Sequence, residues 1–131
     1  MKHPIREMVT KRQLGIHSGI PSFCTASKLV IEAVLEQAKR FDDYALIEAT
    51  SNQVNQFGGY TNMKSRDFAD YVYKIADQID FPREKVLLGG DHLGPLPWAD
   101  LPAAEAALRR LWRRPHQRLL AALHGCLPAS G

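Results

Sequence analysis

The chain has 131 residues, the length of a single domain, and its hydrophobic share of 45% and charged share of 24% are typical of a folded globular protein. The formal net charge of +3 comes from one end, because residues 1–100 hold 12 basic and 13 acidic side chains whereas residues 101–131 hold five and one. No basic stripe with interleaved aromatic residues is present, so nucleic-acid binding is not expected.

The first part of the chain predicts a helix, a strand and a second helix. Residues 5–13 predict a short amphipathic helix, and the apolar and small residues of 19–24 predict a first strand. Ser27 is the expected N-cap of the next helix, which ends near Arg40. Its apolar face is predicted from the spacing of Val30, Ile31, Val34, Leu35 and Ala38.

The next part repeats the pattern. Residues 44–50 predict a second strand, a polar loop covers 51–60, and Ser65 is the expected cap of a helix that stops before Pro82. The apolar positions of that helix are Phe68, Tyr71, Val72, Ile75, Ala76 and Ile79. The run 86–88 predicts a third strand, so the order is βαβαβ, which is typical of an α/β fold with a parallel sheet.

Polar residues follow each predicted strand, in 22–25, in 48–56 and at Asp91 and His92. The carboxyl ends of parallel strands lie at one edge of a sheet, where α/β proteins build their sites. We therefore expect these three groups to share one edge.

The tail of the chain, 101–131, has a different composition. It contains no Lys, Asp, Ile, Val, Phe, Tyr, Thr, Asn or Met. It predicts helices at 103–114 and 117–123 and no fourth strand. The tail is either a basic, Leu-rich appendage, helical or poorly ordered, or a segment translated out of frame. The second interpretation is favoured, because a sheet that stops at its third strand exposes apolar surface that this tail is poorly suited to cover.

The two cysteines, Cys24 and Cys126, form neither a CxxC motif nor a metal-ligand spacing. We expect free thiols in a reducing compartment, with Cys24 as a small buried residue. The first four residues include no apolar signal-peptide core, and no apolar run approaches the roughly 20 residues that span a bilayer. The sequence therefore predicts a cytoplasmic protein with no membrane partner.

The block 46–60 holds a carboxylate at a strand end, several amides and the pair Gly58-Gly59. Amides suit sugar hydroxyls and phosphate oxygens, and a double glycine permits a sharp turn or a close ligand approach. The candidate substrate-binding residues are Glu48, Asn52, Gln53, Asn55 and Gln56. The alternative is an internally bonded loop, which the pattern alone favours because polar loops are common.

Asp91 and His92 form the second candidate site. An Asp beside a His can supply acid–base chemistry, with Asp91 as the candidate catalytic residue, and a metal ligand, with His92 as the candidate. Catalytic zinc usually needs three protein ligands, however, and no partners for His92 are evident. A hydrogen-bonded pair that orders the loop is the favoured alternative. The glycine pairs match neither GxGxxG nor GxxxxGK[ST], so no nucleotide motif is present.

Segments 21–25, 29–33, 46–60 and 88–95 resemble the GatZ/KbaZ family, the non-catalytic subunits of class II D-tagatose-1,6-bisphosphate aldolase. The resemblance extends over roughly residues 12–100. It implies a TIM (β/α)8 barrel, of which this chain would hold the first three strands, because a whole barrel needs about 250 residues. The chain then divides into a partial barrel, 1–100, and an Ala/Leu/Arg-rich tail, 101–131.

The resemblance also implies a function. Such a subunit supports the stability and activity of a separate zinc-dependent catalytic subunit, GatY/KbaY-like. That enzyme splits tagatose 1,6-bisphosphate into glycerone phosphate and glyceraldehyde 3-phosphate in galactitol and N-acetylgalactosamine use. The expected cofactor, zinc, then belongs to the partner and none to this chain.

Asp91-His92 is similar to the Asp-His pair of catalytic class II aldolases, in which Asp is the proton donor and His a zinc ligand. The other ligands of that pattern would fall beyond residue 100, where the sequence departs from the family, so a metal site in this chain is incomplete.

Three functional hypotheses remain. The first is an accessory aldolase subunit, inactive alone. The second is a sugar-phosphate enzyme, an aldolase or tagatose-6-phosphate kinase, in which Asp91, His92 and Glu48 act directly. The third is an unstable translation product whose open sheet edges favour aggregation.

Overall fold

The structure, a computed structural model, describes residues 3–95 and 98–112, with side chains through residue 109. The predicted βαβαβ order is confirmed, with one helix before it and one after it. The predicted helix 117–123 and the rest of the tail beyond residue 112 lie outside the described residues. The elements in chain order are α1 (Pro4–Gln13), β1 (Ser22–Cys24), α2 (Lys28–Arg40), β2 (Ala45–Thr50), α3 (Ser65–Gln78), the 3₁₀ helix η1 (Arg83–Lys85), β3 (Val86–Asp91) and α4 (Ala103–Trp112).

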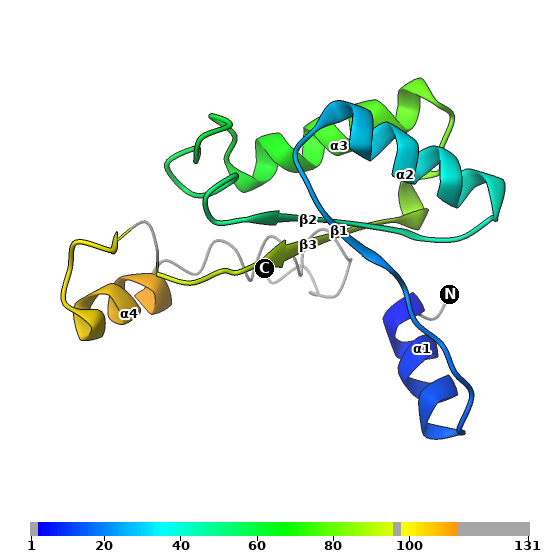
Figure 1. Cartoon of the computed structure of the whole chain (residues 1–131), viewed down its shortest axis with the longest axis horizontal. Helices are drawn as coiled ribbons and strands as arrows, with labels where there is room; N and C mark the ends of the chain where they lie inside the picture. Colours follow the sequence, from blue (N-terminus) through cyan, green and yellow to red (C-terminus); the bar gives the residue numbers. More distant parts are fainter. Residues whose placement is uncertain (1–2, 96–97, 113–131) are drawn as a thin grey trace, which may run out of the picture.

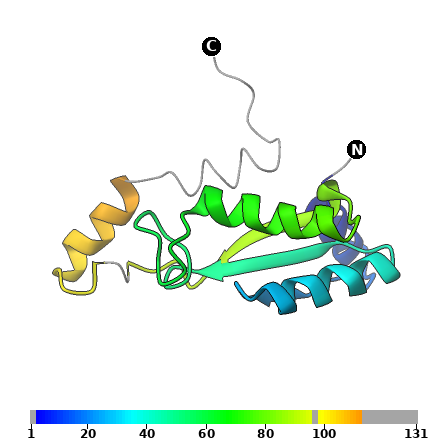
Figure 2. The same ribbon diagram turned by 90° about the horizontal axis from the view of Figure 1, so that it is seen from above.

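The three strands form one parallel sheet in the order β1-β2-β3. The helices α2 and α3 connect consecutive strands and cover the same face of the sheet (Figure 1). In a second view, α4 lies beyond the end of β3, away from the layer of α2 and α3 (Figure 2). This arrangement confirms the α/β class and is consistent with an N-terminal part of a TIM-barrel-like fold.

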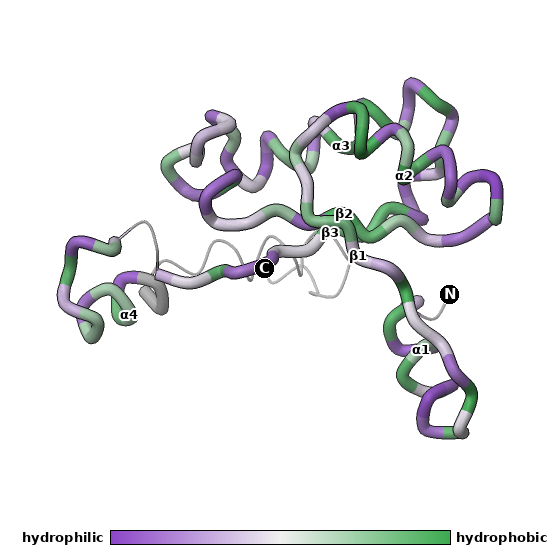
Figure 3. Tube along the Cα trace, in the orientation of Figure 1, coloured by the Kyte–Doolittle hydropathy of each residue, from purple (hydrophilic) through white to green (hydrophobic). Residues whose placement is uncertain are grey.

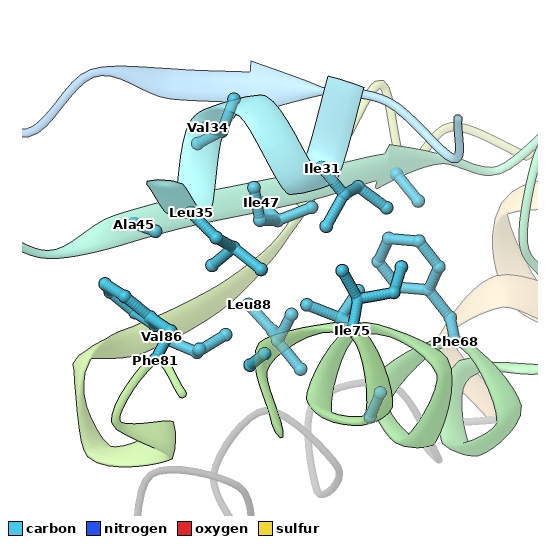
Figure 4. Close-up of a cluster of buried hydrophobic side chains, with 14 of the residues drawn as sticks. Ile31, Val34, Leu35, Ala45, Ile47, Phe68, Ile75, Phe81, Val86 and Leu88 are labelled. Carbon is cyan, nitrogen blue, oxygen red and sulfur yellow. The ribbon is translucent and has the colours of Figure 1, made fainter. Parts of the chain in front are cut away.

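The core lies between the sheet and its two helices. Hydrophobic segments of β2 and β3 run beneath α2 and α3 (Figure 3), and the buried side chains pack together there (Figure 4). On β2, the alternation of a pleated strand turns Ala45, Ile47 and Ala49 toward the helices. The largest side chains that are fully buried are Ile31, Leu35, Ile47, Val72 and Ile75.

The buried face of α2 is rotated slightly from the predicted one. Ile31 is completely buried, whereas Val30, which was expected on the same face, is 44% exposed. Spacing alone is compatible with either residue at the centre of the face, and the position of the sheet decides between them.

The helix starts differ in detail from the predicted caps. Ser27 occupies the N-cap position of α2 and its carbonyl accepts the Ile31 N–H, but its side chain makes no capping bond. Ser65 is not the N-cap of α3, as predicted, but its first residue. The cap is Lys64, whose backbone N–H donates to Asp67 Oδ2 at 2.9 Å. Asp67 therefore satisfies a donor at the start of this helix.

The prediction that Cys24 is buried is wrong. The strand β1 has only three residues, begins after Pro21, and is exposed along its whole length. It pairs with β2 and, among the described residues, with no other strand. An edge position leaves Cys24 accessible, although the residue type is usually buried.

None of the helices in the described ranges is long and apolar enough to cross a membrane.

The ion pair between Asp77 and Arg83 predicts a pH effect on stability. Arg83 Nε donates to Asp77 Oδ1 at 2.8 Å, and this hydrogen bond holds the pKa of Asp77 below its ordinary value of 3.8. A lowered carboxyl pKa stabilises the fold above the unfolded-state pKa, and the contribution is lost as pH falls through the folded-state pKa. We expect Arg83→Gln to raise the Asp77 pKa, measured by NMR titration, and to flatten the loss of stability below about pH 4. A matched Arg66→Gln variant should leave the Asp77 pKa unchanged, and an equal change in both variants would contradict the assignment.

Candidate functional site

Four of the polar residues predicted at the strand ends lie on the face of the sheet that points away from α2 and α3: Cys24, Glu48, Thr50 and Asp91. The register places Cys24 beside Glu48 and Glu48 beside Gly89, and it places Thr50 beside Asp91. Paired residues of parallel strands point to the same side, so the prediction of one shared edge is confirmed for these positions. We call the group of Cys24, Glu48 and Asp91 the acidic corner.

Gly89 provides room for the Glu48 side chain. A Cβ added at Gly89 would lie 2.7 Å from Glu48 Oε1 and 2.8 Å from its Cγ. Because non-bonded carbons need more than 3 Å, Glu48 can lie across β3 only where that strand has no side chain. Gly89 thus makes room for the acidic corner, whereas a Cβ added at Gly90 would meet the Leu93 side chain instead.

Cys24 lies against both acids. Its Sγ is 3.8 Å from Gln53 Oε1, which it approaches as a weak donor. Desolvation by the surrounding chain raises the pKa of the Cys24 thiol first, and Asp91 and then Glu48 raise it further. A backbone hydrogen bond from Thr50 lowers this pKa but does not reverse the shift. The residue is therefore an exposed thiol whose negatively charged form is disfavoured.

These contacts predict slow alkylation of Cys24. We expect Asp91→Asn to accelerate the reaction with iodoacetamide at neutral pH several-fold, because removal of a negative charge raises the fraction of reactive thiolate. Peptide mapping by mass spectrometry would follow Cys24 separately from Cys126. Asp70→Asn is the matched control, because it removes an exposed carboxylate on α3, and it should leave the alkylation rate unchanged. A faster rate in both variants would mean that net charge, not the acidic corner, sets the reactivity.

The loop after β2 is held by its own amides. Asn55 is 9% exposed, its Nδ2 donates to the Ser51 carbonyl at 2.7 Å, and its Oδ1 accepts the backbone N–H groups of Phe57 and Gly59. The Gln53 side chain accepts the Thr50 N–H at 2.8 Å. Two of the candidate binding residues, Gln53 and Asn55, therefore form hydrogen bonds within the loop itself. This agrees with the favoured alternative of an internally bonded loop.

The other two candidate amides differ from these. Asn52 is exposed. Gln56 is partly buried, and its Nε2 has no hydrogen-bond partner among the described residues. A substrate role for Glu48, Asn52, Gln53, Asn55 and Gln56 stays a prediction.

The structure places Asp91 and His92 side by side without a hydrogen bond. His92 Nε2 is 3.6 Å from Asp91 Oδ1, which exceeds hydrogen-bond length, and the His92 side chain is 84% exposed. The loop is ordered instead by Ser51, whose Oγ donates to the His92 carbonyl at 3.2 Å. The favoured prediction of a hydrogen-bonded pair is therefore corrected.

A catalytic zinc site would need about three protein ligands close together. In the described ranges, no three His, Cys, Asp or Glu side chains gather as metal ligands. His116 and His124 lie outside those ranges. The roles of Asp91 as a catalytic residue and His92 as a ligand stay predictions.

A pocket of about 500 Å³ beside His92 was not predicted. Its walls are mostly apolar and include Pro95, Trp98, Leu101 and Ala106. Trp98 also meets Phe57 edge to face, with ring centroids 6.2 Å apart. The signal in the sequence was the set of apolar residues, Pro95, Trp98 and Leu101 among them, that follows Asp91-His92.

Comparisons with known proteins agree with the resemblance seen in the sequence. The family model for D-tagatose-1,6-bisphosphate aldolase subunits, GatZ/KbaZ-like, matches residues 5–111. The aldolase subunit GatZ of Salmonella paratyphi B is 55% identical over 102 residues, 78% of this chain and 24% of its own length. The GatZ of Klebsiella pneumoniae is 54% identical over the same shares. The chain spans about a quarter of the length of these curated relatives.

A solved structure is similar in both sequence and fold. It is described as a probable tagatose 6 phosphate kinase from Sinorhizobium meliloti 1021 and is 60% identical, with a TM-score of 0.67. The match covers 71% of this chain and 24% of that one. The family match runs on into α4, and the division of the chain at residue 100 stays a prediction.

Proposed function

The chain belongs to the GatZ/KbaZ-like family of D-tagatose-1,6-bisphosphate aldolase subunits, and on this basis we propose that it acts as part of an accessory, non-catalytic subunit of that enzyme. The observation that carries the proposal is the 55% identity to GatZ over 102 residues. That stretch is long enough to include the sheet, its two helices and the acidic corner.

The geometry favours assembly over chemistry in this part of the subunit. Glu48 and Asp91 present negative charge on one face, which repels a phosphate group. The side-chain oxygen of Gln53 accepts a hydrogen bond from Thr50, and both ends of the Asn55 amide are bonded within the loop. The partner in this proposal is a zinc-dependent, GatY/KbaY-like catalytic subunit in the cytoplasm. Zinc and the reacting sugar phosphate would be held by that partner.

Reconstitution tests the proposal. The chain would be mixed with a zinc-loaded GatY/KbaY-like subunit, and cleavage of tagatose 1,6-bisphosphate would be followed while the mixture is warmed. We expect no cleavage by the chain alone and a longer half-life of activity for the catalytic subunit in the mixture. An unrelated protein at equal concentration is the control. An unchanged half-life would overturn the accessory role.

The alternative of a sugar-phosphate enzyme makes the opposite prediction. It requires cleavage, or ATP-dependent phosphorylation of tagatose 6-phosphate, by the chain alone, and loss of that activity in Asp91→Asn. The name of the Sinorhizobium meliloti protein is the observation in its favour. No nucleotide-binding motif in this sequence supports the kinase form, so the accessory role is preferred.

A further inference from the structure

The pocket beside His92 is formed by the turn that ends β3. His92 has a φ of +47°, a left-handed backbone conformation that is uncommon outside glycine. Its carbonyl accepts two hydrogen bonds, from Ser51 Oγ at 3.2 Å and from the Gly94 backbone N–H at 2.7 Å. The chain therefore leaves the strand direction after Asp91, and apolar residues that follow enclose a cavity of about 500 Å³.

The apolar wall of this pocket is held by its own backbone. The Trp98 N–H donates to the Pro95 carbonyl at 2.9 Å, and the Leu101 N–H donates to the Trp98 carbonyl at 3.0 Å. Phe57 supports the Trp98 ring edge to face, and Ala106, which is 3% exposed, lines the pocket from α4. A preformed apolar cavity of this volume is typical of a small-molecule site.

The charge at the edge of the pocket is negative. His92 lines the pocket, and Asp91 Oδ1 lies 3.6 Å from its Nε2, so a carboxylate lies beside the opening. Glu48 lies on the same face of the sheet. After desolvation, Asp91 and then Glu48 raise the pKa of the Cys24 thiol, as expected where negative charge gathers.

Little positive charge is available nearby to offset these carboxylates. The loop 51–62 contains no charged residue, and the segment 86–109 contains three acidic residues and a single Arg or Lys, Arg109. Arg109 is bonded within α4, where its Nη2 donates to Glu105 Oε1 at 2.9 Å. The edge of the pocket therefore attracts cations and repels carboxylates and phosphates.

We propose that this pocket binds a small primary amine that carries an aromatic or branched aliphatic body. The body occupies the apolar cavity against Trp98 and Leu101, and the ammonium group donates hydrogen bonds to the Asp91 carboxylate. A sugar phosphate matches neither half, because its hydroxyls would meet apolar walls and its phosphate a negative edge. The inference goes beyond the accessory role and does not depend on it.

A ligand series tests both halves of the proposal. The full 131-residue chain would be titrated with 2-phenylethylamine at about pH 8, where a primary alkyl amine is charged. We expect the indole N–H signal of Trp98 to shift saturably in proton–nitrogen NMR spectra. Trp98→Phe distinguishes this signal from that of Trp112. We expect 3-phenylpropionate, which replaces the ammonium with a carboxylate, and ethylamine, which lacks the ring, each to bind at least about tenfold more weakly.

Two matched pairs of variants locate the ligand. Asp91→Asn should weaken binding of 2-phenylethylamine roughly tenfold, because it removes a charged hydrogen-bond acceptor, whereas Asp70→Asn on α3 should have no effect. Leu101→Ala should weaken binding about fivefold, because it removes apolar wall. Its control is Leu108→Ala, which deletes the same atoms at a position on α4 that is 56% exposed.

The proposal is overturned if 3-phenylpropionate binds as tightly as 2-phenylethylamine, because charge would then play no part. It is also overturned if ethylamine binds equally well, if the Trp98 signal does not move, or if the two variants of each pair behave alike. Circular dichroism of each variant separates loss of binding from loss of folding. If Asp91→Asn does not fold, the Leu101 pair and the ligand series decide.

Discussion

Leu35→Ala is expected to lower the free energy of unfolding by about 2–5 kcal/mol, the usual cost of deleting a leucine from a packed core. Leu35 is fully buried on α2, where it faces the sheet and packs in the cluster that includes Ile47 and Ile75 (Figure 4). The loss has two parts: the hydrophobic free energy of the removed carbons and the cost of the cavity they leave. A core of two helices and three strands can collapse only partly into such a cavity. Since domains have only about 5–15 kcal/mol of stability, the effect is a large fraction of the total.

Leu29→Ala is the matched control for this prediction. It removes the same atoms from the same helix at a position that is 77% exposed, and it should change stability by no more than about 0.5 kcal/mol. Urea unfolding followed by circular dichroism measures both variants. Equal shifts in the two midpoints would show that α2 does not pack on the sheet as described.

Periodicity was sufficient to predict the elements and their order, because each helix shows its buried stripe in its own sequence. It placed Leu35 and Ile75 in the core correctly, where both are buried. Periodicity could not predict which of Val30 and Ile31 is buried. That depends on how the helix is rotated against the sheet, whose residues are distant in the sequence. The same applies to Lys64, which became the cap because Asp67 reaches back to it.

The exposure of Cys24 could not be read from its neighbours. The segment around it is apolar, as for a buried strand, and only the position of β1 at the sheet edge leaves it open. Strand order is a property of the whole sheet and is not encoded in any one strand. The register that brings Cys24 beside Glu48 is likewise visible only after the strands pair.

The sequence predicted the location of the candidate site better than it predicted the contacts between its side chains. The carboxyl ends of parallel strands must meet, so Glu48 and Asp91 were expected on one edge. Whether an amide side chain points outward or into its own loop depends on the turn that follows it. Asn55 points inward because the turn places the Gly59 backbone nitrogen 3.1 Å from Asn55 Oδ1. The sequence shows which hydrogen-bond donors and acceptors the loop contains, but their partners depend on the conformation of the turn.

Gly59→Ala is expected to destabilise the protein by about 3 kcal/mol, from left-handed backbone strain together with a collision. Gly59 has a φ of +56°, and an added Cβ would lie 2.3 Å from the Gln53 carbonyl oxygen and 2.6 Å from that of Asn52. Both obstacles are backbone atoms, which cannot rotate away as a side chain could. The loop must therefore open, and Gln53 must move from its contacts with Thr50 and Cys24.

Gly15→Ala separates the two causes. Gly15 has a φ of +78° but no atom within 4 Å of an added Cβ, so only the conformational cost, about 1–2 kcal/mol, applies. That cost falls on the end of α1, which buries no residue, and the main unfolding transition should move little. Urea unfolding gives the stability, and the alkylation rate of Cys24 reports on the acidic corner. We expect Gly59→Ala to change both and Gly15→Ala to change neither appreciably. If Gly59→Ala left the Cys24 rate unaltered, the loop would not position Gln53 against the acidic corner, and the site would depend on the three strands alone.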